Sequence, residues 1–270
     1  MASSRRFPVL CGGLLLSAQA GVVRGFQASG RLPGRRPVSS LNNGPLVDLS
    51  EDAPRDIDTM QQWAYNCGVQ HHEGIHLTSY DNWFDIFAAT STDIPGGTCV
   101  MYVPANMYLT SYGALQEFGQ QEDAEKLIGS LAGSDQFPTF YLFLKVLVEY
   151  ERGQDSPWYY WLNSMPRVFN NGAAMTPSCY DCLPPLAAKF CMEERIKFTN
   201  YKQALKKVDF VTEDVQNDEE LLKWVYNVVE TRGLDVGGES IIIPMADMVS
   251  SMAGFICFRA PLSLFHHDID

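Results

Sequence analysis

The chain has 270 residues, of which 46% are hydrophobic and 12% aromatic, enough for a globular core of one or two domains. The formal net charge is −12, but six arginines precede the first acidic residue, Asp48. The remainder therefore holds 14 of the 20 basic residues against 32 acidic ones, a net charge of −18. Such an acidic body repels a phosphate backbone, which disfavours nucleic acid as a partner.

The first 47 residues have the composition of a targeting sequence. Residues 1–25 combine a basic start, an interrupted apolar stretch and small residues near Gly25, as a secretory signal peptide does. Residues 26–47 are rich in Arg and Ser and lack acid, which is typical of a transit peptide. In tandem they resemble the bipartite presequence of algae with secondary plastids. We expect a plastid location, with a secreted or endomembrane one as the alternative.

No membrane span is expected after removal of the presequence, since no later run reaches roughly 18 apolar residues.

The segment "QHHEGIHLTSYD" contains H-E-x-x-H from His72 to His76, the pattern of zinc peptidases. That chemistry needs a helix, because only helical spacing brings imidazoles at i and i+4 to one ion. Residues 56–67 have the apolar stripe of a helix that ends at Gly68, whereas residues 74–80 alternate in polarity and predict a strand. Strand residues four apart are roughly 13 Å from each other. We therefore interpret the motif as a chance match and expect no metal site, with a zinc hydrolase as a minor alternative.

Further elements follow in chain order. Residues 84–90 and 99–110 read as short strands separated by a turn at 93–98. Helices are predicted over 122–133, 137–153, 156–162, 186–208 and 217–233, and residues 239–249 read as a strand. Residues 140–150 are apolar on nearly every face, which predicts a central helix, and Asn217 is the expected N-cap of the last one. Strands, a helical block and a final strand predict an α+β protein with a helical insertion.

Seven cysteines are scattered along the chain, and their irregular spacing makes a poor disulfide framework. Cys179 and Cys182 form a C-x-x-C motif, but no second pair or histidine couple lies nearby to complete a zinc site. We expect buried or partly buried thiols, with redox or metal use as the alternative.

Three segments carry a resemblance to a known family. They are "TSTDIPGGTCVMYVPANMYLTS" (90–111), "SPWYYWLNSMP" (156–166) and "VVETRG…IIIPMADM" (228–248). Each resembles a motif of SET-domain methyltransferases of the Rubisco large-subunit methyltransferase-like branch, and they keep the family order. The resemblance implies an N-terminal SET portion at 48–110, a helical insertion at 111–235 and the start of a C-terminal SET portion at 236–249. The implied fold is α+β: small curved β-sheets of a SET domain with a large helical insertion and without the C-terminal part of the domain.

The resemblance also implies a reaction and a site. SET proteins of this branch transfer a methyl group from S-adenosyl-L-methionine to a protein amine, usually lysine, so a protein substrate is the implied partner. Asp85, Ile86 and Phe87 stand where the family has the G-x-G of its cofactor loop. Arg232 matches a family arginine near the substrate and cofactor end, and Asp247 matches the aspartate of the family's D-M-x-N-H motif. The resemblance implies that both are substrate-binding residues.

Two further family features are absent from the sequence. Ser250 and Ser251 replace an Asn-His pair that binds the cofactor. No residue matches the catalytic tyrosine, and the last tyrosine, Tyr226, lies on a predicted helix. From these departures we expect little or no activity.

A non-catalytic protein-interaction module on a degenerate SET scaffold is the alternative function. Its candidate anchors are Trp158, Tyr159, Tyr160 and Trp161, although core packing is the favoured interpretation of this run. Residues 250–270 resemble sequence from outside the reading frame, and we interpret His266 and His267 there as incidental. Exposed strand edges at that end would favour association.

Overall fold

The computed structural model describes residues 46–79, 85–131 and 133–249. Three predicted segments lie outside these ranges: the predicted signal peptide, nearly all of the transit-peptide-like segment, and the tail at 250–270 with Ser250, Ser251, His266 and His267. Val47 is buried, and its carbonyl accepts a hydrogen bond from the Tyr150 hydroxyl (3.3 Å), so the folded body includes residue 47. Within the described ranges, no helix is both long and apolar enough to cross a membrane.

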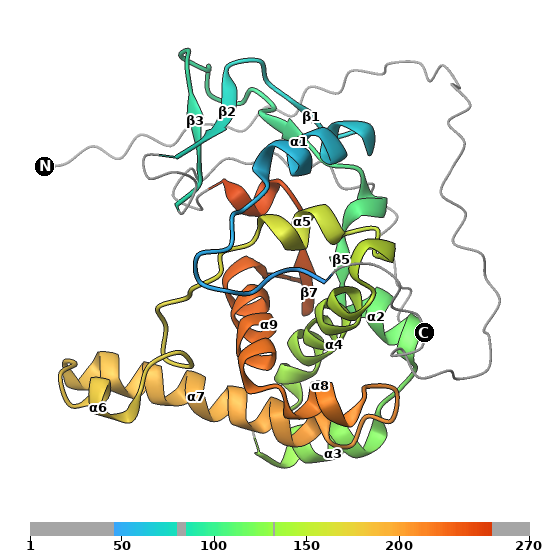
Figure 1. Cartoon of the computed structure of the whole chain (residues 1–270), viewed down its shortest axis with the longest axis vertical. Coiled ribbons are helices and arrows are strands. Elements are labelled where there is room, and N and C mark those ends of the chain that lie inside the picture. Colours follow the sequence, from blue (N-terminus) through green and yellow to red (C-terminus); the bar gives the residue numbers. More distant parts are fainter. Residues whose placement is uncertain (1–45, 80–84, 132, 250–270) are drawn as a thin grey trace, which may run out of the picture. The chain divides into compact units, whose positions relative to one another are not determined.

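The first part of the body holds one helix and two small antiparallel sheets (Figure 1). Asp56 caps the helix, because its carboxylate accepts the Thr59 N–H (3.0 Å). In the sheets β1 pairs with β4 and β2 pairs with β3. The predicted helix and the predicted strand after it are both confirmed. The elements are α1 (Ile57–Asn66), β1 (Gln70–His71), β2 (Ile75–Thr78), β3 (Phe87–Thr90) and β4 (Met101–Tyr102).

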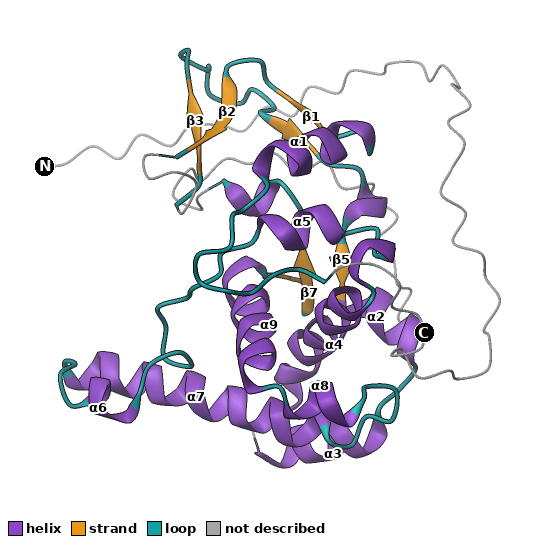
Figure 2. Cartoon of the chain, viewed as in Figure 1, coloured by secondary structure: helices purple, strands orange, loops and turns teal. Residues whose placement is uncertain are grey.

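A third sheet joins the two ends of the helical block. Its order is β5-β7-β6, where β5 is Leu109–Thr110, β6 is Leu234–Val236 and β7 is Glu239–Ile242. All its pairs are antiparallel, with Leu109 opposite Ile242. The strand before the block therefore pairs with the strand after it, which closes the helical part as an insertion. The predicted α+β class, with small separate sheets and a large helical segment, is confirmed (Figure 2).

The helical block is built around α4 (Phe137–Glu151). Every residue of α4 from Phe140 onward is buried, and α4 packs on α2, α9 and β7, so the predicted central helix is confirmed. The other helices are α2 (Ser111–Phe118), α3 (Glu122–Leu131), α5 (Tyr159–Ser164), α6 (Pro177–Tyr180), α7 (Pro185–Leu205), α8 (Glu213–Asn217) and α9 (Glu219–Arg232). Short 3-10 helices lie at Ala105–Met107, Ser134–Gln136, Gly153–Asp155 and Ala246–Met248.

The predicted N-cap of α9 was wrong by one residue. Asp218, not Asn217, caps the helix, since its carboxylate accepts the Leu221 N–H (3.0 Å), while Asn217 ends α8. Both residue types cap helices well, and the turn between α8 and α9 decides between them.

Two predicted strands are shorter than expected, and both are interrupted near a proline, which has no N–H to donate. In the first, Pro104 precedes a 3-10 helix between β4 and β5. In the second, β7 ends at Ile242, Pro244 follows, and Met245 adopts a strained backbone with φ 72° and ψ −46°. The chain after β7 therefore turns sharply into the 3-10 helix that contains Asp247.

Candidate functional site

Two of the three family-like segments, 156–166 and 228–248, meet at Asp247. Arg232, the last residue of α9, donates from Nη1 to the Asp247 carbonyl oxygen (2.7 Å). Trp161 of α5, which is fully buried, donates from Nε1 to Asp247 Oδ2 (3.0 Å). Arg232 and Trp161, which are 15 and 86 positions from Asp247 in the sequence, thus both contact this aspartate. The structure brings together the two predicted substrate-end residues, Arg232 and Asp247.

This cluster leaves two polar atoms unsatisfied. Among the described residues, Asp247 Oδ1 and Arg232 Nε are both buried and have no hydrogen-bond partner. One is an acceptor on a carboxylate and the other is a donor on a guanidinium. Because an unpaired buried polar atom costs free energy, these two atoms would be stabilised by a hydrogen bond with a polar group of a ligand or with a water molecule. Burial raises the pKa of the Asp247 carboxyl above its ordinary value, although Arg232, the Trp161 hydrogen bond and Arg55 each pull the pKa down.

Arg55 is a site residue that no sequence motif indicates. It lies just before α1 in the irregular stretch "EDAPRD", and its Nε donates to the Ser164 carbonyl at the end of α5 (2.7 Å). Burial, together with the charges of Arg232 and Arg167, lowers the pKa of Arg55 to about 10, although Asp85 and Asp247 act in the opposite direction. Arg55 therefore lies within the electrostatic reach of both the predicted cofactor loop and Asp247.

The predicted cofactor loop is only partly at this site. Asp85 is exposed and acts on Arg55 through its charge, as described above. Ile86 is half-buried and packs against the core, and Phe87 begins β3 opposite Thr78. Ile86 and Phe87 thus contribute to packing and to the sheet. The side chains of this loop occupy positions where glycines would let a backbone approach a ligand closely.

The H-E-x-x-H segment is not helical. His72 lies in a turn, where its Nδ1 accepts the Gly74 N–H (3.1 Å), and His76 is exposed in the middle of β2 opposite Ala89. The two imidazoles therefore do not share one helical face, which the zinc-peptidase pattern requires. Within the described part of the chain, no group of three or more His, Cys, Asp or Glu side chains is arranged to hold a metal ion.

The aromatic run at 158–161 packs mainly inside the protein. Trp158 is half-buried and donates from Nε1 to the Met107 carbonyl (2.8 Å), and Trp161 is buried against Asp247. The favoured interpretation of this run as core packing is confirmed for Trp161, which is fully buried, and the interaction-module alternative stays a prediction. Tyr160 is the exposed member, at 42%. Large apolar side chains are exposed instead on α7, at Leu186, Phe190, Met192 and Ile196.

The expected burial of the cysteines is only partly correct. Cys67 and Cys191 are half-buried, but Cys99, Cys179 and Cys182 are exposed. Cys179 and Cys182 lie at α6 and the turn after it, where few residues cover them, so the C-x-x-C motif is open to solvent.

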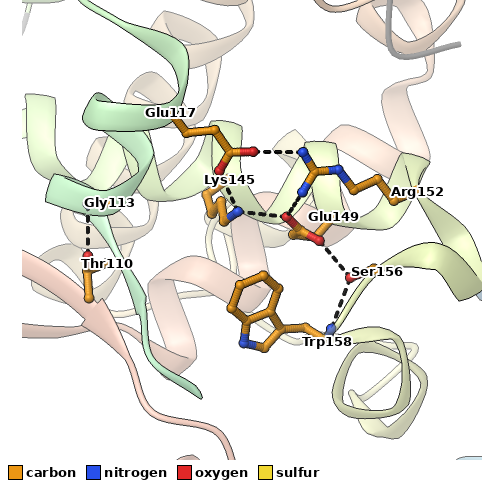
Figure 3. Close-up of polar contacts among 8 residues, drawn as sticks. All are labelled: Thr110, Gly113, Glu117, Lys145, Glu149, Arg152, Ser156 and Trp158. Atoms are coloured by element: carbon orange, nitrogen blue, oxygen red, sulfur yellow. Dashed lines mark hydrogen bonds and ion pairs between the residues drawn. The ribbon is translucent and has the colours of Figure 1, made fainter. Parts of the chain in front are cut away.

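A buried ion-pair network supports the start of α5 (Figure 3). Glu149 of α4 is fully buried, and its Oε1 accepts from Lys145 Nζ (2.7 Å) and from Arg152 Nη1. Both cations also reach Glu117 of α2, at 2.6 and 2.7 Å. Burial alone would raise the pKa of Glu117, but Lys145 and Arg152 outweigh it and hold that pKa below its ordinary value. The network ties α2 to α4.

The same network reaches the "SPW" motif. Glu149 Oε2 accepts from the Ser156 hydroxyl (2.7 Å), and Ser156 Oγ in turn accepts the Trp158 N–H (3.1 Å). Lys145 Nζ lies 4.8 Å from the centre of the Trp158 ring, in a cation–π contact. These contacts orient the first turn of α5, and α5 carries Trp161 to Asp247. Ser156 and Trp158 thus position α5, and through α5 they position Trp161 at Asp247.

Small antiparallel sheets and a helical insertion that the β5–β7 pairing closes make up a SET-like fold. Among solved structures, the chain resembles Rubisco LSMT bound to AdoMet (TM-score 0.54, 15% identity, 71% of this chain and 43% of that chain). It also resembles the SET domain of LSMT bound to lysine and AdoHcy (TM-score 0.56, 14% identity, 73% and 45%). The expected SET fold is confirmed, and the chain spans less than half the length of these structures.

The likeness is one of fold rather than of close sequence. A third structure, Rubisco LSMT bound to sinefungin and monomethyllysine, matches at 13% identity and a TM-score of 0.53. No protein-family model matches the chain. No curated protein matches its sequence.

Proposed function

We propose that this chain binds S-adenosyl-L-methionine and belongs by function to the protein-lysine methyltransferases. One observation carries the proposal: within a SET-like fold, two family-like segments (156–166 and 228–248) meet at Asp247, and one acceptor and one donor stay unsatisfied there. The similar solved structures are bound to AdoMet, AdoHcy or sinefungin, and two of them also to lysine or monomethyllysine.

The unsatisfied atoms fit the charged end of the cofactor. The methionine part of S-adenosyl-L-methionine carries an ammonium group and a carboxylate, so it offers a donor to Asp247 Oδ1 and an acceptor to Arg232 Nε. Trp161 would hold the Asp247 carboxylate in place through its bond to Oδ2. When bound, the cofactor would supply an electrophilic methyl group that passes in line to an amine, with S-adenosyl-L-homocysteine as the leaving group. The protein contributes by positioning the two groups and by excluding water.

The acidic net charge of the chain favours a cationic substrate. The described body is acidic, and the exposed Asp85 carboxylate lies within electrostatic reach of Arg55. A lysine ammonium is attracted by such carboxylates, and it must lose its proton before it can attack. Because side chains replace the glycines at Asp85-Ile86-Phe87, we propose that cofactor affinity and turnover are low compared with a G-x-G loop.

Calorimetric titration of the full chain with S-adenosyl-L-methionine and with sinefungin tests the proposal. We expect saturable binding with Kd below about 1 mM. Asp247→Asn should weaken binding at least about tenfold, because a charge-assisted hydrogen bond is lost. Asp123→Asn, a matched change at a side chain that is 78% exposed on α3, should leave binding unchanged.

Two results would overturn the proposal. One is the absence of binding heat at millimolar cofactor from a chain whose circular dichroism is that of a folded protein. The other is binding that Asp247→Asn and Arg232→Gln both leave intact. Transfer of a labelled methyl group to lysine side chains then distinguishes an active methyltransferase from a protein that only binds the cofactor.

We also propose plastid targeting, on the composition of residues 1–47 alone. Fusion of these residues to a fluorescent protein, expressed in an alga with a secondary plastid, should direct the fusion to that compartment. Fluorescence in the secretory system or the medium would favour the alternative.

A further inference from the structure

The C-x-x-C motif lies in a tight turn with both thiols exposed. Cys179 belongs to α6, and Cys182 lies two residues past its end. The Cys182 N–H donates to the Cys179 carbonyl (3.2 Å), which is the hydrogen bond of a four-residue turn. In such a turn the first and last Cα atoms are less than about 7 Å apart, and disulfides span Cα separations of about 4.4–6.8 Å. The backbone therefore already holds the two cysteines within disulfide range.

The surroundings distinguish the two thiols from each other. The Thr176 hydroxyl lies 3.2 Å from Cys179 Sγ, and the Cys179 N–H donates to the Thr176 carbonyl (2.9 Å). Hydrogen bonds of the Cys179 thiol with the hydroxyl and with the backbone of Thr176 lower the pKa of that thiol. Cys182 Sγ lies farther from a polar neighbour, 3.9 Å from the Ser178 carbonyl. Cys179 is thus the better nucleophile, because the thiolate is the reactive form.

The turn is held in place by contacts around Gly172, which packs against α7. The Tyr180 hydroxyl, between the two cysteines, donates to the Gly172 carbonyl (2.6 Å), and the Gly172 N–H donates to Glu194 Oε2 (2.6 Å). The Arg195 guanidinium of α7 donates to the Met175 carbonyl just before α6 (3.1 Å). Because these contacts do not involve the cysteines, the thiols stay close together when reduced.

We propose that Cys179 and Cys182 are a redox-active dithiol that exchanges with small-molecule disulfides. The Cys179 thiolate attacks one sulfur of the disulfide, breaks its S–S bond and releases one thiolate, which leaves a mixed disulfide on Cys179. Cys182 then loses its proton to solvent and attacks Cys179 Sγ, displacing the second thiolate. The two cysteines lose two electrons and two protons, and the substrate disulfide gains them as two thiols.

The size of the loop indicates a redox role rather than a structural one. A bond between Cys179 and Cys182 closes a loop of only four residues, counted from the sequence positions. In the chain-entropy model the stabilisation by a disulfide grows with loop length, so this bond adds little to the stability of the fold. The site lies on α6, on other elements than the Asp247 cluster, so it does not depend on the proposed methyl transfer.

The test uses the full chain equilibrated with oxidised and reduced glutathione in varied ratio, then quenched by alkylation and mapped by mass spectrometry. As the oxidised fraction rises, Cys179 and Cys182 should lose alkylation together, and their peptide should lose the mass of two hydrogen atoms. Cys182→Ser should trap a glutathione adduct on Cys179. Thr176→Val should slow the formation of that adduct several-fold at neutral pH, because the contact between the Thr176 hydroxyl and Cys179 Sγ is lost.

Cys99→Ser is the matched control, since Cys99 is also exposed but its Sγ lies against the Met101 carbonyl (3.5 Å). Its oxidation curve for the Cys179–Cys182 pair should equal that of the wild type. Stable glutathione adducts on both cysteines of the wild type would overturn the proposal. Oxidation of Cys99 in parallel with Cys179 and Cys182 would also overturn it. So would full alkylation of Cys179 and Cys182 at every glutathione ratio.

Discussion

Replacing Glu149 by Gln should destabilise the protein strongly, because this fully buried carboxylate accepts from three donors at once. The amide keeps the size of the side chain but has one acceptor oxygen, and its NH2 group faces Lys145 and Arg152 or Ser156, which are themselves donors. The variant therefore tests charge and hydrogen bonding rather than volume.

The magnitude follows from what remains after the change. Removing one partner of a buried ion pair costs about 3–5 kcal/mol, because a buried charge is left uncompensated. Lys145 and Arg152 both keep Glu117 as a partner, so the lower end, about 3 kcal/mol, is expected. For a domain of this size, the melting temperature should fall by about 6–12 °C.

Urea unfolding followed by circular dichroism measures the loss, with Glu122→Gln as the matched control. Glu122 pairs with Lys126 at 3.2 Å, but its side chain is 72% exposed, so that change should cost less than about 1 kcal/mol. Adding Lys145→Met to Glu149→Gln should recover part of the loss, since the unpaired cation is removed. A loss below about 1 kcal/mol in Glu149→Gln, equal to that of the control, would refute the network.

Glu149→Gln should also weaken cofactor binding at the candidate site. The Ser156 and Trp158 contacts that begin α5 depend on Glu149, and α5 carries Trp161 to Asp247. Cofactor affinity, measured well below the melting temperature, should therefore fall in Glu149→Gln but not in Glu122→Gln. Unchanged affinity would mean that α5 is held by its other packing alone.

Three further changes test other parts of the structure. Burial raises the pKa of Glu151 to about 7, above the ordinary 4.5, so its contribution to stability is complete below pH 4.5 and is lost as the pH rises through 7. Glu151→Gln should thus stabilise the protein by about 1–3 kcal/mol at pH 8 and by little at pH 4, in urea titrations at both values. Trp161→Phe removes the donor to Asp247 Oδ2 and should cost about 1–3 kcal/mol in the same assay. Gly172→Ala places a Cβ 2.4 Å from the Cys191 carbonyl oxygen, which must push α7 away at a cost of about 1–3 kcal/mol. Limited proteolysis near α6 should then be faster, and an unchanged rate would contradict the close approach.

Local sequence patterns predicted a helix well where one face of the helix is buried or where all of its faces are buried. The stripe at Met60 and Ala64 and the apolar run of α4 both lie in the core as expected. Short strands were harder, because β4 and β5 have two residues each and a proline interrupts the segment between them. Period-2 alternation cannot show where such strands stop.

The site was predictable only in part. Arg232 and Asp247 were indicated by family-like motifs, and the structure joins them directly. Arg55 carries no such signal, because its role depends on α1 lying against α5, a contact between residues about 100 positions apart. Trp161 was predicted to be core, and it is, but its hydrogen bond to Asp247 depends on where β7 ends.

The position of Asp247 is set by packing around α4 more than by any local motif. Because α4 is buried on all sides, α2, α9 and β7 must cover it, and the β5–β7 pairing fixes where the chain leaves the helical block. α9 then ends at Arg232, and Pro244 and the strained Met245 turn the chain back so that Asp247 meets it. A change in the core beneath these elements would therefore move the unsatisfied donor and acceptor relative to each other. Ligand affinity should respond to such core changes even where no site residue is altered.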